Sequence, residues 1–155
     1  MRTLILALAL PLLAQAPTAP KPKVPVAGPF EPTRDALKDF EAAKAQAKAT
    51  GRRILMDVGG NWCGWCRLLH GFWEQQPEVK ALRDQHFVFL MVNFSPENKN
   101  EALLSRFPKI QGYPHFFVLD AEGQLLHAQD TGKLEEGKGY SPAKMTDFFR
   151  AWAPK

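Results

Sequence analysis

The stretch Trp62-Cys63-Gly64-Trp65-Cys66 contains both cysteines of the chain, two residues apart. The apolar run at 53–58 predicts a buried strand before it, and residues 67–70 predict the start of a helix after it. At such a strand-to-helix junction, the N–H groups and dipole of the helix N-terminus favour the thiolate of Cys63. We expect Cys63 to be exposed and Cys66, one turn further on, to lie beneath it. The sequence therefore predicts a dithiol that interconverts with a disulfide.

Other uses of this cysteine pair are weaker but remain open. A purely structural disulfide that closes so short a loop would contribute little stability. A zinc site needs four ligands, and His70 is the one further candidate nearby in sequence. Haem attachment is excluded because Arg67, not histidine, follows Cys66. The sequence therefore predicts neither a metal site nor a bound organic cofactor.

Three features together resemble the thioredoxin superfamily. They are the stretch 62–66, Asp57 six residues before Cys63, and the tripeptide Gly112-Tyr113-Pro114. The resemblance covers residues 34 to 153 and is greatest to exported thioredoxin-like and thiol:disulfide interchange proteins. It implies an α/β protein with a thioredoxin-like fold, in which helices flank both faces of a central mixed β-sheet.

Two positions depart from ordinary thioredoxins. Trp65 stands where those proteins have a proline between the cysteines, so the redox potential does not carry over from the resemblance. The strand predicted at 87–92 has no lysine to partner Asp57. The protonation behaviour of this acid is therefore not implied by the resemblance.

The resemblance implies a role for each residue of the site. Cys63 would be the nucleophile and Cys66 the resolving thiol, while a buried Asp57 would exchange a proton with Cys66. The alternative for Asp57 is a hydrogen bond to a turn. A cis peptide bond at Pro114 would present the backbone of Tyr113 to a substrate chain, and the alternative is a proline that simply starts a strand.

Two tryptophans complete the predicted substrate-binding set of Trp62, Trp65, Tyr113 and Pro114. We expect Trp62 to pack against the domain. We expect Trp65 to offer an exposed apolar face to an unfolded or flexible partner.

These residues predict an exported thiol–disulfide oxidoreductase that reduces or exchanges protein disulfides. Its partners would be protein disulfide substrates and a thiol-transferring redox protein, for which a membrane-bound donor is a candidate. The competing interpretation is a non-catalytic, client-binding module on the same fold. Because both cysteines are present, the enzyme is favoured. We expect a monomer.

Composition limits the other classes of function. The 155 residues carry a net charge of +4, with 45% hydrophobic and 11% aromatic residues, which is enough for a packed core. Basic residues are mixed with acidic ones along the chain and form no basic block, so a nucleic-acid partner is not expected. Two cysteines are too few for a disulfide scaffold.

The N-terminal residues predict export. Arg2, the apolar run 4–13 and the Ala14-Gln15-Ala16 site form a signal peptide over 1–16, with cleavage after Ala14 as an alternative. Six prolines in 17–33 predict an extended linker. The thioredoxin-like domain would then occupy 34–155, in the periplasm or outside the cell.

Periodicity and turn residues predict the order of elements within this domain. In chain order we expect a helix at 34–50 that is capped by Thr33 and ends at Gly51, a strand at 54–58, helices at 63–73 and 77–83, a strand at 87–93, a helix from Ser95 through Phe107, strands at 115–119 and 124–127, a loop at 130–140 and a helix at 142–152. This order fits a mixed sheet between two helical layers.

Overall fold

The computed structural model describes residues 28–155. The predicted signal peptide and most of the predicted linker, residues 1–27, lie outside the described residues. In chain order the elements are α1 (Ala36–Thr50), β1 (Arg53–Gly59), α2 (Gly64–Gln75), α3 (Pro77–His86), β2 (Phe87–Asn93), α4 (Glu101–Leu104), β3 (His115–Leu119), β4 (Leu125–Asp130), the 3₁₀ helix η1 (Thr131–Leu134), β5 (Glu135–Glu136), β6 (Gly139–Tyr140) and α5 (Pro142–Trp152).

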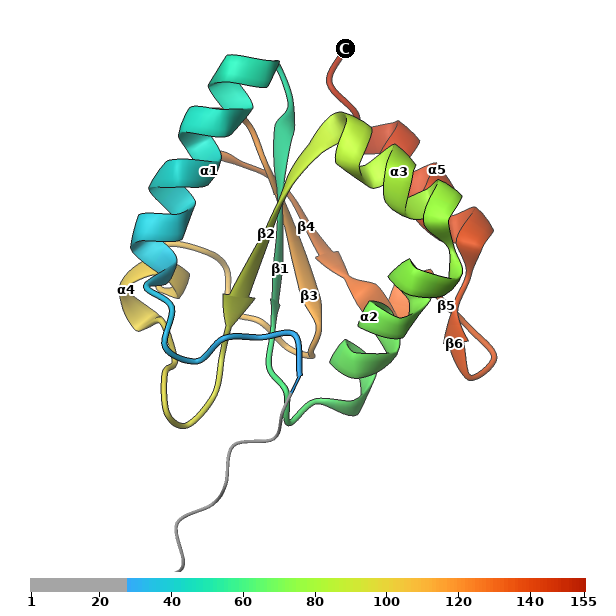
Figure 1. Ribbon diagram of the computed structural model, residues 1–155, viewed down its shortest axis with the longest axis horizontal. Helices are drawn as coiled ribbons and strands as arrows, with labels where there is room; N and C mark the ends of the chain where they lie inside the picture. The colour runs from blue at the N-terminus through green and yellow to red at the C-terminus, as the bar shows by residue number, and fades with distance from the viewer. Residues whose placement is uncertain (1–27) are drawn as a thin grey trace, which may run out of the picture.

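Four strands form one mixed sheet in the order β2-β1-β3-β4. β1 is parallel to β2, with Asp57 opposite Met91, whereas β3 is antiparallel to both β1 and β4. Figure 1 shows α1 and α4 on one side of this sheet and α2, α3 and α5 on the other. The predicted α/β architecture, a mixed sheet with helices on both faces, is confirmed.

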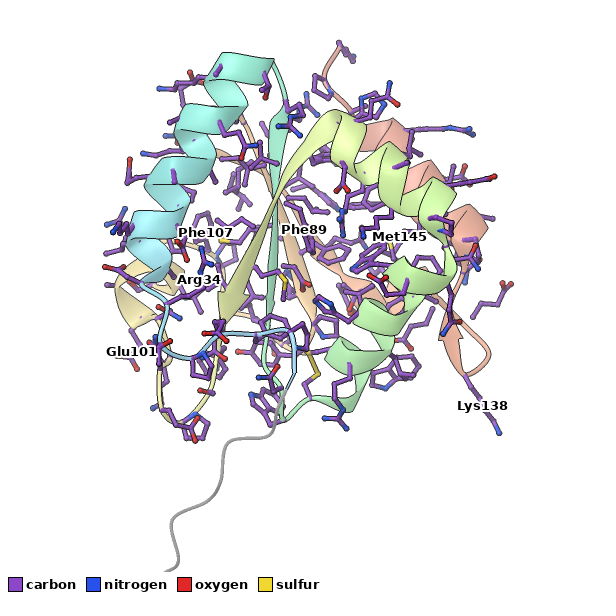
Figure 2. All side chains as sticks on the ribbon, viewed as in Figure 1. Arg34, Phe89, Glu101, Phe107, Lys138 and Met145 are labelled. Atoms are coloured by element: carbon purple, nitrogen blue, oxygen red, sulfur yellow. A yellow bond between two sulfur atoms is a disulfide. The ribbon has the colours of Figure 1, made fainter. Side chains whose placement is uncertain are left out.

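The sheet buries a separate hydrophobic cluster on each face. Side chains alternate between the faces along a strand, so Met56 packs toward α1 while its neighbour Leu55 packs toward α2. Figure 2 shows Phe107 on the α1 side, and Phe89 and Met145 on the opposite side. Ile54 through Gly59 are all buried, as expected for a central strand that is covered on both faces.

The first helix begins two residues later than the sequence predicts. The side chain of Asp35 accepts hydrogen bonds from the N–H groups of Leu37 and Lys38, at 3.0 and 3.2 Å. Asp35, rather than Thr33, is therefore the N-cap of α1. The helix ends at Gly51 as predicted, where the backbone turns left-handed with φ of 67°.

The helix predicted over 95–107 is mostly wrong, because only the short α4 forms there. Ser95 and Asn98 close a turn in which the backbone N–H of each residue donates to the carbonyl of the other. Asn100 then adopts a left-handed backbone with φ of 49°, and its side-chain amide donates to the last carbonyl of β2 at 2.7 Å. Such side chain–backbone bonds compete with helix formation, so this connection stays irregular until Glu101.

The predicted loop at 130–140 contains regular structure. η1 follows β4 directly, and β5 and β6 then form a two-stranded antiparallel sheet. This small sheet brings Tyr140 against α2, where its ring lies edge-on to Trp65 with centroids 5.8 Å apart. The segment therefore forms one wall around the cysteine-bearing helix.

Residues 29–34 form a strap that precedes α1, and the sequence assigns most of it to the linker. Figure 1 shows this segment, in blue, crossing from the start of α2 to the start of α1. The strap packs against the domain because Phe30 is 2% exposed and shares a hydrophobic cluster with both cysteines. The described chain is therefore part of the folded unit from before residue 34.

Candidate active site

The two cysteines lie at the N-terminus of α2 and are joined by a disulfide, which Figure 2 shows as a yellow bond. Cys63 is the N-cap residue, and its Sγ accepts a hydrogen bond from the backbone N–H of Cys66 at 3.1 Å. This N–H and the positive end of the helix dipole stabilise negative charge on the Cys63 sulfur when the disulfide is open. The pairing predicted from the sequence is present.

The exposure of the pair differs from the prediction. Cys63 is 6% exposed and Cys66 is 1% exposed. The expectation of an exposed Cys63 is therefore wrong for this disulfide form, because Phe30, Trp65 and Tyr113 pack around the pair. Cys63 is still the more accessible of the two, which is the order that the sequence predicts.

Asp57 is fully buried on the face of β1 against which the cysteines pack. Asp57 and Gly59 are two residues apart on one strand, so both face the same side of the sheet. Gly59 contacts the disulfide closely, because a Cβ atom added there would lie 2.7 Å from Cys66 Sγ. Burial raises the pKa of Asp57 to about 7, and neither carboxylate oxygen has a hydrogen-bond partner among the described residues. The buried position that the predicted proton role requires is present.

Arg83 on α3 is the charged residue that acts on the pKa of Asp57. Arg83 is 5% exposed, and its guanidinium lies 3.8 Å from the ring centroid of Phe89 and 4.8 Å from that of Trp73. It also forms an ion pair with Asp84 at 2.6 Å. Its positive charge opposes the effect of burial and lowers the pKa of Asp57. The cation that β2 lacks is thus supplied by a helix, which no sequence spacing indicates.

Two more ionisable side chains border this region. His70 lies one turn after Cys66 on α2, its ring is edge-on to Phe30 with centroids 6.0 Å apart, and burial lowers its pKa, with a further lowering by Arg83. Tyr140 is buried, and burial raises the pKa of its phenol well above the usual value. Both groups therefore favour their neutral forms near neutral pH.

The Tyr113-Pro114 peptide bond is cis, and this loop faces the disulfide. The carbonyl oxygen of Tyr113 lies 3.5 Å from Cys63 Sγ. Pro114 is buried, and its own carbonyl accepts a hydrogen bond from the Thr131 hydroxyl at 2.6 Å. The structure therefore brings Tyr113 and Pro114 beside the cysteines, as the sequence predicts, and anchors them to η1.

The environments of the two tryptophans are the reverse of those predicted. Trp62 is 48% exposed, and its indole N–H donates to the carbonyl of Phe94 at 2.6 Å. Trp65 is half-buried because Tyr140 covers its ring. The exposed aromatic surface beside Cys63 is therefore that of Trp62, held upright by a hydrogen bond and an edge-on contact with Tyr113.

Phe30 and Asn61 belong to the site but were not predicted. The side chain of Asn61 accepts the Phe30 N–H at 2.9 Å and donates to the Phe30 carbonyl at 2.7 Å. The sequence holds two faint signals for this contact. Phe30 is an isolated aromatic residue among prolines, and Asn61 directly precedes the motif at 62–66.

Two further features of residues 28–155 concern metals and membranes. No group of three or more His, Cys, Asp or Glu side chains in this range is arranged to hold a metal ion. No helix in the same range is both long and apolar enough to cross a membrane.

The chain is similar to a thioredoxin-like family and to proteins named for thiol–disulfide chemistry. A family model described as "Thioredoxin-like" matches residues 35–121. The thiol:disulfide interchange protein DsbD of Citrobacter koseri is 30% identical over 110 residues, which is 68% of this chain and 18% of DsbD. The disulfide bond reductase DsbH of Chlamydia pneumoniae is 30% identical over 80 residues, or 46% of this chain and 48% of DsbH. The chain thus spans less than a fifth of DsbD and about half of DsbH.

Solved structures show the same fold. A disulphide isomerase from Xylella fastidiosa Temecula1 superposes with a TM-score of 0.69 at 27% identity, covering 79% of this chain and 95% of that one. The C-terminal domain of Neisseria meningitidis DsbD, in its oxidised form, gives a TM-score of 0.53 at 21% identity, covering 76% and 93%. With the family model matching more than half of its residues, this chain belongs to the thioredoxin-like family.

Proposed function

We propose that this protein is an exported thiol–disulfide oxidoreductase that reduces or exchanges protein disulfides through Cys63 and Cys66. The observation that carries the proposal is the disulfide at the N-terminus of α2, with the Tyr113 carbonyl 3.5 Å from Cys63 Sγ. A sulfur placed there is stabilised as a thiolate and lies beside a backbone that a substrate chain can pair with. The similarity to proteins named as an interchange protein, a reductase and an isomerase supports the same chemistry.

In the reducing direction, the Cys63 thiolate attacks one sulfur of a partner disulfide. The partner S–S bond breaks, and its other sulfur leaves as a thiolate. The Cys66 thiolate then attacks Cys63 Sγ in the mixed disulfide and releases the second partner sulfur. Two electrons pass from the protein to the partner, and the disulfide between Cys63 and Cys66 is the product on this side. The same steps in the opposite direction donate the disulfide to a partner dithiol, and two electrons return to Cys63 and Cys66.

Asp57 is proposed to accept the proton that Cys66 must lose before it can attack. A base works best when its pKa is close to the operating pH, and burial raises the pKa of Asp57 to about 7. Gly59, which contacts Cys66 Sγ, shares a face of β1 with Asp57. At neutral pH the carboxylate therefore has both protonation states available beside the resolving thiol.

The substrate chain is proposed to lie along Trp62, Tyr113 and Pro114, with Trp65 behind them. The exposed ring of Trp62 offers apolar surface next to Cys63. The Tyr113 backbone offers hydrogen bonds that do not depend on the partner's sequence. This combination suits unfolded or flexible protein segments that contain a disulfide.

The remaining parts of the proposal concern location and supply of electrons. Residues 1–16 would direct export and 17–33 would link the signal to the domain at 34–155, although the strap within this linker packs on the domain. The protein would then work in the periplasm or outside the cell. That environment is oxidising, so a second redox protein must return electrons to the pair.

The proposal is tested by reduction of insulin with dithiothreitol as the electron source. The wild-type chain should accelerate insulin precipitation, and Cys63→Ser should fall to the uncatalysed rate. Ala45→Ser is the matched control, because it adds a hydroxyl on the exposed surface of α1 and should retain the full rate. Equal rates for the wild type and Cys63→Ser would reject the catalytic proposal and leave the client-binding module.

A second variant checks the order of attack. Cys66→Ser should accumulate a mixed disulfide through Cys63, which is seen as a mass increase that dithiothreitol removes. Cys63→Ser should accumulate far less of this adduct, because its remaining thiol lies in the less exposed position. Equal trapping by the two variants would contradict the assignment of Cys63 as the nucleophile.

A further inference from the structure

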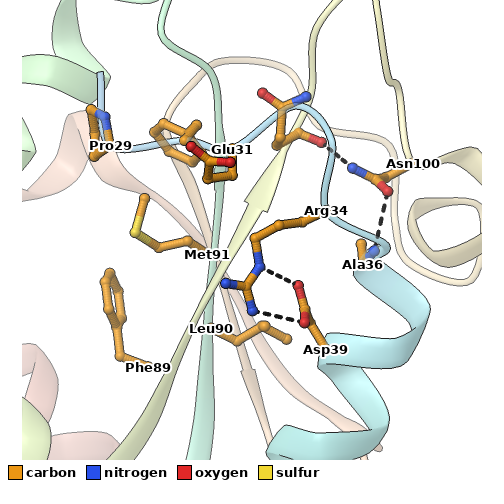
Figure 3. Close-up of a pocket in the computed structure, with 11 residues that line it drawn as sticks. Pro29, Glu31, Arg34, Ala36, Asp39, Phe89, Leu90, Met91 and Asn100 are labelled. Carbon is orange, nitrogen blue, oxygen red and sulfur yellow. Dashed lines mark hydrogen bonds and ion pairs between the residues drawn. The ribbon is translucent and has the colours of Figure 1, made fainter. Parts of the chain in front are cut away.

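The strap, residues 29–34, is fixed to the domain at both of its ends. At one end, both backbone groups of Phe30 bond to the Asn61 side chain. At the other, the Asn98 amide donates to the carbonyls of Pro32 and Arg34, at 2.9 and 3.1 Å. Figure 3 shows Arg34 directed at Asp39 of α1, with which it forms an ion pair at 2.6 Å. These bonds hold the strap in one position over the edge strand β2.

A cavity separates part of the strap from this edge strand. The strap encloses this cavity of about 260 Å³ with Phe89, Leu90 and Met91 of β2, as seen in Figure 3. Phe30 alone among the apolar residues of the strap is buried, at 2% exposed. The strap therefore serves to place a single phenyl ring.

The ring of Phe30 lies against the rear of the disulfide. A Cβ atom added to Gly59 would be 2.7 Å from Cys66 Sγ and 2.9 Å from Phe30 Cζ, so the sulfur and the ring tip meet over the same glycine. Phe30, Cys63 and Cys66 form one hydrophobic cluster, separate from the two large clusters of the sheet. The ring thus packs beside Cys66 on β1 and helps to bury it, at 1% exposed.

Asn61 couples this ring to the motif itself. It immediately precedes Trp62, and its carbonyl accepts a hydrogen bond from the Arg67 side chain at 2.7 Å. Gly28 lies so close to Asn61 that a Cβ atom added there would clash with its Oδ1. A side chain that bonds both backbone groups of Phe30 fixes the ring relative to the cysteines.

We propose that Phe30 is a positioning residue of the dithiol site: latched by Asn61, its ring closes the rear of Cys66 and keeps water from the resolving thiol. This inference deepens the proposed oxidoreductase function and rests on it. It assigns a positioning role at the dithiol site to a segment that the sequence predicts to be mostly linker.

The consequence of this closure is a thiol that gives up its proton only to a group inside the site. Burial in apolar surroundings raises the pKa of a thiol, and removal of the ring would admit water and lower it. The ionisable groups around this region are Asp57 of β1, His70 of α2, Arg83 of α3, Tyr140 of β6 and Tyr113 in the loop before β3, whose pKa burial raises. On the strap, Glu31 is exposed, so the strap contributes an apolar ring rather than a charge at this position.

The test measures alkylation of Cys66 by iodoacetamide as a function of pH in the full chain carrying Cys63→Ser. Phe30→Ala is added to open the rear of the site, and Phe30→Leu to keep it partly filled. Phe40→Ala is the matched control, because Phe40 is a similarly buried phenylalanine, 4% exposed, in the cluster against α1. Asn61→Ala removes the latch and leaves the ring unchanged.

We expect Phe30→Ala to increase the alkylation rate at pH 7 by about tenfold and to move the titration midpoint of Cys66 to lower pH. Asn61→Ala and Phe30→Leu should each give a smaller increase in the same direction, of roughly threefold. Phe40→Ala should leave both quantities within about twofold of the parent, although it lowers the free energy of unfolding. If Phe30→Ala does not fold, Asn61→Ala and Phe30→Leu carry the same test.

An unchanged rate in the Phe30 and Asn61 variants would overturn the proposal. So would an equal increase in Phe40→Ala, because the effect would then be a general loosening of the core. The readout reports the environment of one thiol and needs no disulfide substrate. It can therefore fail while insulin reduction succeeds, or succeed while insulin reduction fails, so the two proposals are judged separately.

Discussion

The two faces of the sheet bury different kinds of side chain. Toward α1 the cluster consists of apolar side chains, among them the fully buried Met56 and Phe117. Toward α2 and α3 the buried side chains include Asp57 of β1 and Arg83 of α3, which are the two buried charged residues in the described part of the chain. A buried ionisable group opposes folding unless it is compensated, and such groups gather where chemistry is done. One face of the sheet therefore chiefly stabilises the fold, and the other holds the reacting groups.

The largest expected effect is on the face toward α1. Phe117→Ala should lower the free energy of unfolding by about 3–5 kcal/mol, because a fully buried ring is removed from a close-packed cluster. Urea denaturation measures this loss. The rate of insulin reduction per folded molecule should stay unchanged. A fall in that rate, measured well below the denaturation midpoint, would break the separation of the two faces.

Asp57→Asn should act on both stability and activity. The unfolded chain releases the Asp57 proton near pH 4, whereas the folded protein keeps it until about pH 7, so the free energy of unfolding falls as pH rises between these values. The asparagine variant should lack this slope and be more stable at pH 8 by up to about 4 kcal/mol. Its insulin reduction at pH 7 should be slower. Urea titrations at pH 5 and pH 8 measure the difference, and parallel pH dependence in both proteins would contradict the burial argument.

Arg83→Gln should shift the pH dependence without removing any reacting group. The positive charge of Arg83 lowers the pKa of Asp57, so its loss should move that pKa above about 7. The midpoint of the pH–rate profile for insulin reduction should rise, and the rate at pH 7 should fall roughly threefold. Arg150→Gln on the exposed side of α5 is the control and should leave the profile in place. Identical pH–rate profiles for the two variants would show that Arg83 does not influence the pKa of Asp57.

The smallest expected effect concerns Trp62, at the edge of the reactive face. Trp62→Ala should raise KM for a protein disulfide by roughly twofold, because an exposed apolar contact is lost, while kcat stays the same. Trp65→Ala should mainly lower the free energy of unfolding, since its ring packs on Tyr140. Steady-state kinetics and urea denaturation of both variants separate these roles. The opposite pattern would restore the assignment predicted from the sequence.

Much of the fold was accessible from the sequence because local signals agree with the final packing. The apolar run before the cysteines, the glycine at the end of α1 and the proline at the start of α5 each act within a few residues. The helix predicted over 95–107 is wrong because the apolar spacing in that segment does not agree with the structure that forms. There Ser95, Asn98 and Asn100 bond to nearby backbone groups and interrupt the helix, and the spacing of apolar residues does not reveal such side chain–backbone bonds.

The order of residues by itself determined the order of helices and strands of an α/β fold and the pairing of Cys63 with Cys66, because periodicity and the spacing of the motif carry this information. That Pro114 lies near the cysteines was implied only by the resemblance to a known family. Only the tertiary structure decided which tryptophan is exposed, which cation acts on Asp57 and where Phe30 lies. Exposure, electrostatic coupling and closure of a cavity depend on distances between segments that are remote in sequence. The short-range patterns in the chain do not encode those distances.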